Sequence, residues 1–179
     1  NDHHVGRVLF HVWWAVGRGM IGLAWTNCGP TMAPTGGREP ILGNNSFAIA
    51  IPAGKHPPLV LDMATGAAAW GKIFVAQQEK RKIPSTWALD KNGLPTDDPD
   101  AAADKGMIQP FGGYKGYGLS LLIDIFTGVL SGGAFATQVR TLYSQIDSPS
   151  GSAHACGAVL VDSFIPFNEF CSRVDAISD

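Results

Sequence analysis

A single lysine stands in a run of glycines, where residues 112–118 read GGYKGYG with Lys115 at the centre and a strongly apolar segment after it. Glycines let backbone N–H groups approach an anion closely, and the N-terminus of a following helix adds a positive dipole end. Lys115 would add a full positive charge for a phosphate. The segment therefore indicates a phosphate-binding loop, with a glycine-rich connector that carries a solvent-exposed lysine as the alternative.

Two standard phosphate-binding fingerprints do not fit this loop. The Walker A motif, G-x-x-x-x-G-K-[ST], requires Ser or Thr after the lysine, where this chain has Gly116. The Rossmann fingerprint, G-x-G-x-x-G, requires a preceding strand and an acidic residue about twenty positions later. Here the glycines are spaced differently and the residues MIQP precede them. The loop alone does not decide between nucleotide binding and the connector.

Length, charge and cysteine content restrict the class of protein. A chain of 179 residues is long enough for one domain with a substantial core. Its net charge of −2 gives no reason to expect nucleic acid or an acidic membrane surface as partner, and it has no apolar run long enough to span a membrane. The cysteines, Cys28, Cys156 and Cys171, are odd in number and widely spaced. This pattern argues against a disulfide framework or a zinc site and favours a reducing, cytoplasmic location.

Hydrophobic patterning predicts a mixed α and β domain with at least four strands and four helices. The predicted strands cover residues 20–27, 46–52, 57–64 and 154–162. The predicted helices cover residues 5–16, 64–82, the apolar run after Gly116, and 166–177. Between them, Asn92-Gly93 predicts a small hairpin. The adjacent Trp13 and Trp14 would point to different faces of the first helix, which predicts that this helix is covered on more than one side.

Several longer motifs occur in one order along the chain: IGLAWTN, MAPTGGREPILGNN, FAIAIP, LDMAT, WGKI, IPSTWALDKNGLPTDDP and GGYKGYGLSLLIDIFTGVLSG. Together they resemble the malate/L-lactate dehydrogenase family, nearly continuously from Asn1 to about Gly133. The family includes ureidoglycolate dehydrogenase, diketogulonate reductase and piperideine-2-carboxylate reductase. The resemblance implies an NAD- or NADP-dependent enzyme that interconverts a 2-hydroxy acid and a 2-oxo acid, of the malate, lactate or ureidoglycolate type.

The resemblance also implies an architecture. It predicts a non-Rossmann NAD(P)-binding domain, built on a mixed, largely antiparallel sheet flanked by helices, in a homodimer with the active site near the subunit interface. Residues 1–179 would form this single core domain, about half of a family chain, without the family's N-terminal helical region and C-terminal end. The alternative function is a non-catalytic nucleotide-binding module or an inactive fragment.

The resemblance also assigns a catalytic residue. The segment NDHHVG resembles the family's S-N-H-F-G, in which the histidine two positions before the glycine lies in the active site, and His4 occupies this position. Hydride transfer to a carbonyl carbon needs a proton on the oxygen, and imidazole titrates near neutrality. His4 is therefore the predicted acid/base group. The alternative is that His4 orients the substrate while a histidine of the absent upstream region donates the proton.

The predicted cofactor-binding residues match family segments at Cys28, Asp62, Met63, Ala64 and Lys115. Cys28 falls where the family often has a serine that touches the cofactor, which puts a polar contact there in doubt because a thiol is a weaker hydrogen-bond partner. Asp62 could accept hydrogen bonds from the cofactor, or it could cap a helix that begins at Ala64.

Two further polar residues are predicted to be structural. Asp124 interrupts the apolar helix after Gly116, and we expect a buried, hydrogen-bonded carboxylate that supports the loop around Lys115. His154 opens a strand and is predicted to stabilise the fold. No metal-ligand set is predicted.

Overall fold

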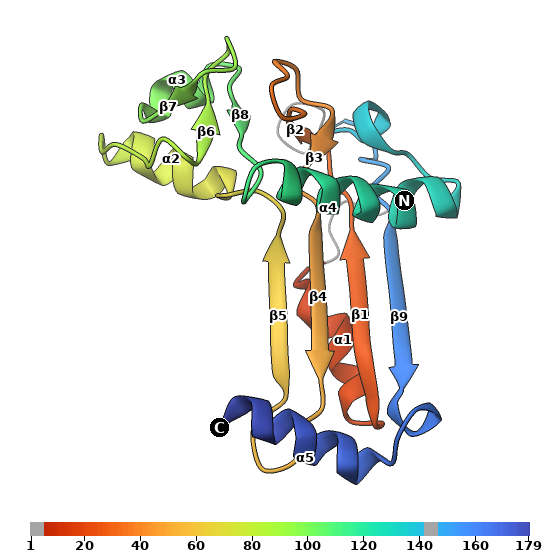
Figure 1. Ribbon diagram of the computed structural model, residues 1–179. Coiled ribbons are helices and arrows are strands. Elements are labelled where there is room, and N and C mark those ends of the chain that lie inside the picture. Colours follow the sequence, from red (N-terminus) through yellow and green to blue (C-terminus); the bar gives the residue numbers. More distant parts are fainter. Residues whose placement is uncertain (1–5, 142–146) are drawn as a thin grey trace.

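A four-stranded antiparallel sheet forms the centre of the protein (Figure 1). The computed structural model describes residues 6–141 and 147–179. The strands lie in the order β5 (Leu59–Ala64), β4 (Ser46–Ile51), β1 (Met20–Thr26) and β9 (His154–Leu160). Each adjacent pair is antiparallel. These are the four strands predicted from the sequence, so the expectation of a mixed α and β fold with antiparallel strands is confirmed.

One face of the sheet is covered by α1 (Val8–Val16). The helix buries Val8 and Val12 against alanines of β1 and β4, which are Ala24, Ala48 and Ala50. Small residues let the helix approach the sheet closely, because a Cβ added at Gly22 would lie 2.4 Å from the carbonyl oxygen of Val12. This close contact fixes α1 directly over the middle of the sheet.

The expectation for the two tryptophans of α1 is wrong. Trp13 and Trp14 are 52% and 61% exposed. Their turn of the helix faces away from the sheet, since only the stripe that carries Val8 and Val12 contacts the strands. Trp14 is partly screened by Arg18, whose guanidinium carbon lies 5.3 Å from the centre of the ring.

Helices cross both ends of the sheet (Figure 1). At one end lies α4 (Tyr114–Asp124), which continues into a π-helical turn, Ile125–Val129. Phe126 of this turn stacks on Trp25 of β1, with 5.9 Å between ring centres. At the other end lies α5 (Phe167–Ser178). Its Asp175 accepts hydrogen bonds from the backbone of residues 54–56, and these bonds, the one from Lys55 first, lower the pKa of the carboxyl group.

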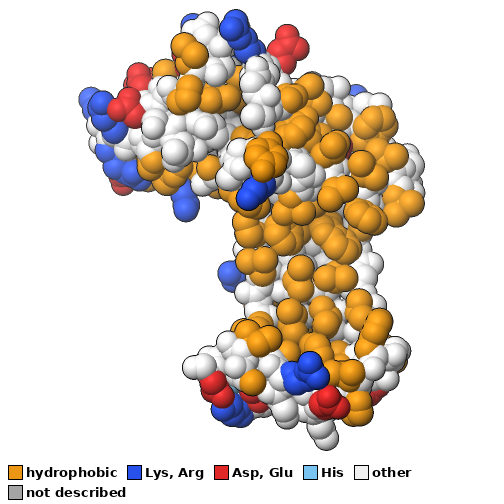
Figure 2. Space-filling view, in the orientation of Figure 1, with side chains coloured by type: hydrophobic (Ala, Val, Ile, Leu, Met, Phe, Trp, Pro, Cys, Tyr) orange, Lys and Arg blue, Asp and Glu red, His pale blue; other side chains and the backbone are white. Residues whose placement is uncertain are grey.

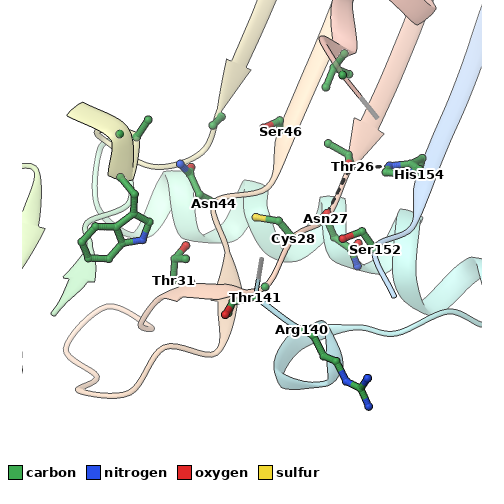
Figure 3. Close-up of a pocket in the computed structure, with 17 residues that line it drawn as sticks. Thr26, Asn27, Cys28, Thr31, Asn44, Ser46, Arg140, Thr141, Ser152 and His154 are labelled. Atoms are coloured by element: carbon green, nitrogen blue, oxygen red, sulfur yellow. Dashed lines mark hydrogen bonds between the residues drawn. The ribbon is translucent and has the colours of Figure 1, made fainter. Parts of the chain in front are cut away.

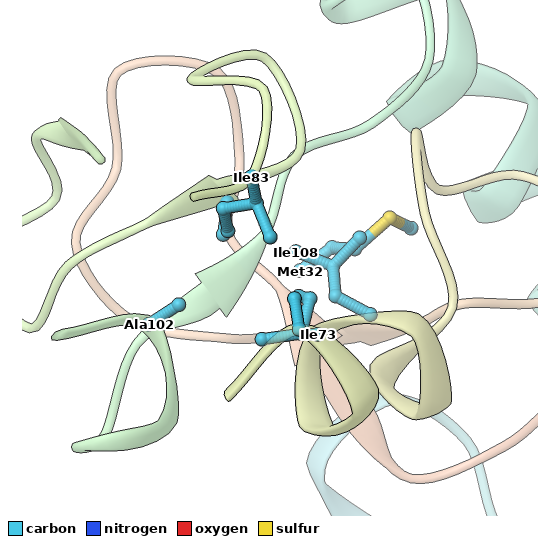
Figure 4. Close-up of a cluster of buried hydrophobic side chains, with 7 residues drawn as sticks. Met32, Ile73, Ile83, Ala102 and Ile108 are labelled. Atoms are coloured by element: carbon cyan, nitrogen blue, oxygen red, sulfur yellow. The ribbon is translucent and has the colours of Figure 1, made fainter. Parts of the chain in front are cut away.

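A smaller unit packs beside the end of the sheet that α4 crosses. It contains α2 (Trp70–Gln78), α3 (Pro99–Ala103) and a three-stranded sheet of β6 (Ala88–Leu89), β7 (Pro95–Thr96) and β8 (Met107–Ile108). The turn between β6 and β7 carries Gly93 at φ 79°, which confirms the predicted hairpin. The buried side chains of this unit are Met32, Ile73, Ala76, Ile83, Ala88, Ala102 and Ile108 (Figure 4).

Met32 joins this unit to the rest of the molecule. It belongs to β2 (Pro30–Met32), which pairs with β3 (Leu42–Gly43) in the segment between β1 and β4. Short 3-10 helices at Ala136–Gln138 and Val161–Ser163 complete the described elements. None of the helices in the described ranges is long and apolar enough to span a membrane.

Several predicted helix boundaries differ from the structure, including the end of α2, which lies at Gln78 and not at residue 82. The helix predicted from residue 64 begins at Trp70, because the preceding residues form a turn in which Gly66 donates its N–H to the Asn44 side chain, 2.6 Å away. The helix predicted after Gly116 begins at Tyr114. Lys115 therefore lies within the first turn of α4, at the positive end of the helix dipole.

Candidate functional site

A cavity of about 420 Å³ opens at one end of the central sheet, where β1 and β5 end and β4 and β9 begin. Its lining includes Thr26, Asn27 and Cys28 from the end of β1, Ser46 and Ala64 from the neighbouring strands, and His154 from β9 (Figure 3). Thr31 and Asn44 line it from the segment between β1 and β4. The antiparallel pairing thus collects the ends of four strands around one space.

A buried carboxylate holds one wall of the cavity. Asp124 Oδ1 accepts from Asn27 Nδ2 at 2.9 Å, and Asp124 Oδ2 accepts from the Ala136 N–H at 2.7 Å. Asn27 in turn accepts from the Ala153 N–H at 2.7 Å and donates to the Ala134 carbonyl at 3.0 Å. The predicted buried, hydrogen-bonded state of Asp124 is confirmed. Its partners are different from those expected, because it supports the cavity wall at Asn27 and not the loop around Lys115.

Two consecutive asparagines hold the opposite walls. Asn44 accepts from Gly66, in the turn that follows β5, and donates to the Ala68 carbonyl at 3.4 Å. Asn45 is fully buried and accepts from the Cys28 N–H at 3.0 Å while donating to the Ser120 carbonyl of α4 at 3.0 Å. Side chains that bond to backbone groups of separate segments fix the relative positions of those segments.

His154 lines the cavity and does more than open a strand. Its Nδ1 lies 2.7 Å from Thr26 Oγ1, and that hydroxyl donates to the Asn27 carbonyl at 3.2 Å. This contact joins the end of β1 to the start of β9, with the donor set by the tautomer of the ring. The sequence interpretation of His154 as structural is therefore incomplete, since the residue pairs with Thr26 and also faces the cavity.

Cys28 and Ala64, two of the predicted cofactor-binding residues, both line the cavity. Burial, together with the nearby charge of Asp124, raises the pKa of the Cys28 thiol to about 11. The thiol is therefore neutral near physiological pH and unsuited to act as a nucleophile. A Cβ added at Gly43 would lie 2.7 Å from Cys28 Sγ, so the sulfur packs against the β3 backbone.

Asp62 and Met63 do not line this cavity. Asp62 Oδ2 accepts from the Leu9 N–H at 3.3 Å and lies 3.7 Å from Arg7 Nε, both at the start of α1. The alternative in which Asp62 caps a helix from Ala64 is wrong, because no helix begins there and the carboxylate instead stabilises the first turn of α1. Met63 pairs with Phe47, and successive strand residues point to opposite faces, so it lies on the face away from α1.

Lys115 is exposed in the first turn of α4, next to a second cavity of about 600 Å³ that Gly112 and Gly113 line. Backbone hydrogen bonds tie this glycine loop to the turn after β5, since Phe111 donates to the Thr65 carbonyl at 3.0 Å and Ala67 donates to the Gln109 carbonyl at 2.7 Å. The two predicted cofactor-binding motifs are therefore neighbours in space.

His4, the predicted catalytic residue, lies outside the described residues. Gly6, two positions later in the sequence, lines the 420 Å³ cavity. Among the described lining residues Arg140 carries the one full positive charge, none is acidic, and the Arg140 guanidinium extends away from the other labelled side chains in Figure 3. No cluster of potential metal ligands occurs in the parts of the chain that the structure describes.

Comparison with known proteins gives consistent matches. A family model described as malate/L-lactate dehydrogenase matches residues 1–179. The NAD(+) ureidoglycolate dehydrogenase of Escherichia coli is 41% identical over 143 residues, which cover 80% of this chain and 40% of that protein. The NADP(+) (2R)-3-sulfolactate dehydrogenase of Chromohalobacter salexigens is 35% identical over 161 residues, covering 90% of this chain and 47% of that protein.

A solved structure shares the fold. The sulfolactate dehydrogenase of Methanocaldococcus jannaschii superposes with a TM-score of 0.91 at 39% identity, covering 100% of this chain and 51% of that one. The chain thus spans about half the length of the proteins that it matches.

Replacing Asp124 by Asn tests the support of the cavity wall. Both partners of the carboxylate are donors, so an amide must turn its own NH₂ group toward Asn27 or toward the Ala136 N–H. We expect the free energy of unfolding to fall by about 1–3 kcal/mol in urea denaturation. Asp104→Asn, which alters an exposed carboxylate paired with Lys91, is the control and should change little. Equal stability of the two variants would contradict this role of Asp124.

Proposed function

Because the chain belongs to the malate/L-lactate dehydrogenase family, we propose that it serves NAD(P)-dependent interconversion of a 2-hydroxy acid and a 2-oxo acid. The observation that carries the proposal is the cavity at the sheet end, which brings Cys28 and Ala64 together beside the glycine loop. Relatives are named for NAD(+) and for NADP(+), so the proposal includes both nucleotides.

The residues present fit a dinucleotide. The wall formed by β1, β5 and the segment between β1 and β4 is uncharged and polar, which suits a nicotinamide and its ribose. Gly112 and Gly113 have φ of 58° and 64°, and a Cβ at Gly113 would meet no atom within 4 Å. The N-terminus of α4 has no side-chain cap, and Gly113 and Gly116 donate to carbonyls of the preceding loop. The N–H groups of Tyr114 and Lys115, together with the Lys115 side chain, can therefore hold a pyrophosphate. When bound, the nicotinamide supplies or accepts the hydride.

His4 is the proposed acid/base group for the substrate oxygen, as the family resemblance implies, and the position of Gly6 in the cavity lining supports it. We also propose that residues 1–179 form a non-Rossmann nucleotide-binding core, in which Asp62 and Met63 are further cofactor-binding residues at the end of β5, as the family resemblance implies. The antiparallel pairing of all four central strands favours this architecture. The unpaired state of Cys28, Cys156 and Cys171 fits the proposed cytoplasmic location.

A nucleotide-binding module without catalysis is the second candidate. It is favoured by the length of the chain, which matches 40% and 47% of the two enzymes compared above.

Fluorescence titration and turnover together test the proposal. We expect NADH or NADPH to quench tryptophan fluorescence, and we expect reduction of NAD⁺ or NADP⁺ with malate, lactate or ureidoglycolate. Lys115→Ala should weaken nucleotide binding about tenfold, because one charged contact to phosphate is lost. Lys55→Ala is the control, since Lys55 lies at the opposite end of the sheet beside α5.

Three outcomes separate the candidates. Binding with turnover supports the dehydrogenase. Binding without turnover of any of these acids supports the module. Absence of nucleotide binding, or equal affinity of the Lys115→Ala and Lys55→Ala variants, would contradict the proposed cofactor site.

We also propose that the protein pairs with a second copy through an apolar surface. The surface comprises the sheet face opposite α1 and the outer side of α4 and its π turn (Figure 2). Its exposed members include Leu59, Leu61, Leu121, Leu122, Ile125, Phe126, Val129 and Leu130. An exposed apolar surface that extends over several elements is typical of a protein interface.

Sedimentation velocity tests the homodimer. We expect the unaltered protein to sediment as a dimer and Leu61→Lys to sediment as a monomer, because a buried unpaired charge opposes association. Trp14→Lys is the matched control, since it places the same charge on the exposed side of α1, away from this surface. A monomeric unaltered protein, or dissociation by the Trp14 variant alone, would contradict the proposed interface.

A further inference from the structure

One side chain in the cavity wall has an unusual hydrogen-bonding state. The hydroxyl oxygen of Thr31 is buried and has no hydrogen-bond partner among the described residues. A buried polar group without a partner is costly, and the few that occur in native proteins need an explanation. Thr31 lines the 420 Å³ cavity from β2, and Figure 3 shows it beside the space that Asn44 and Cys28 border.

Several other polar side chains of this wall bond within the protein. Thr26 bonds to His154 and to the Asn27 carbonyl. Asn27 bonds to Asp124, and Asn44 bonds to the turn after β5. These groups shape the cavity, but their capacity for hydrogen bonds is largely used. The hydroxyl of Thr31 differs from them because it has both a donor and an acceptor available.

Cys28 cannot supply the same contact. It lies three residues before Thr31 in the same wall, and its thiol is neutral and packs against the β3 backbone. A thiol is also a weak hydrogen-bond donor and acceptor. A polar ligand that enters between Cys28 and Asn44 therefore finds a hydroxyl partner at Thr31.

We propose that Thr31 is a cofactor-binding residue, whose hydroxyl hydrogen-bonds the nicotinamide end of the dinucleotide, through the carboxamide or the adjoining ribose. This inference rests on the proposed function. The nicotinamide end is favoured over the phosphates because the wall around Thr31 is uncharged, whereas the glycine loop and Lys115 lie beside the other cavity. Thr31 then makes the polar contact that the weaker hydrogen bonding of a thiol disfavours at Cys28.

The isosteric variant Thr31→Val gives a test in which stability and binding change differently. Removing a hydroxyl that lacks a partner should leave the melting temperature unchanged or raise it. The Kd for NADH or NADPH, measured by fluorescence titration, should rise about tenfold. Thr31→Ser keeps the hydroxyl and should retain the affinity of the unaltered protein.

Thr65→Val is the matched control. Thr65 is fully buried, its hydroxyl also has no partner among the described residues, and it does not line the cavity. We expect its melting temperature to respond as in Thr31→Val, with no change in nucleotide affinity. ADP, which lacks both the nicotinamide and its ribose, should bind the Thr31→Val variant as well as it binds the unaltered protein.

The outcomes distinguish failure of the proposed function from failure of the inference about Thr31. If the unaltered protein binds no dinucleotide, the proposed function fails. If it binds and Thr31→Val binds equally well, the inference about Thr31 alone is overturned. An equal loss for ADP, or a raised KM for the acid with unchanged nucleotide affinity, would likewise overturn the contact with the nicotinamide end.

Discussion

The hydrogen bond between Asp124 and Asn27 is the interaction on which the cavity depends. It joins the end of α4 to the end of β1 in the interior of the protein, 97 positions apart in the sequence. The same two side chains also hold residues 134–136 and the start of β9. Both carboxylate oxygens accept from N–H donors, and these bonds hold the group without a cationic partner among the described residues. A rigid wall results, and Cys28 and Thr31 extend from it.

The polar side chains of the cavity wall include some that hold its shape and one hydroxyl that is available to a ligand. Asn27, Asn44 and Asn45 bond to backbone or to other side chains, which sets the spacing between β1, β5 and α4. Thr31 carries a hydroxyl without such a bond. A hydride-transfer site requires side chains that are held in place by hydrogen bonds, because small displacements of the reacting atoms slow the reaction. This division links the buried network to the proposed chemistry.

Much of the fold followed from local pattern. The four central strands were predicted because each is a short apolar run bounded by turn-forming residues, and the hairpin at Asn92-Gly93 was predicted from its turn chemistry. The start of α2 was not predicted correctly, because the helical spacing of apolar residues extends back to residue 64. In the structure, a hydrogen bond from the Gly66 N–H to the Asn44 side chain, 22 positions away, holds a turn there instead. Patterns within one segment carry no information on such distant partners.

Prediction of the site residues was limited in the same way, because contacts between distant segments are not visible in local sequence patterns. Cys28 and Ala64 were identified through the family resemblance, and the structure places both in one cavity. The part played by His154 was missed because its contact with Thr26 depends on the register between β1 and β9. The orphaned hydroxyl of Thr31 could not be found in the sequence, since it is defined by the absence of a partner within the described structure.

A crystal structure of the protein soaked with the reduced dinucleotide tests the central claim most directly. The account predicts the nicotinamide ring in the cavity between Cys28 and Ala64, with the pyrophosphate against the first turn of α4 near Lys115. A dinucleotide seated away from both the sheet end and the glycine loop would contradict it.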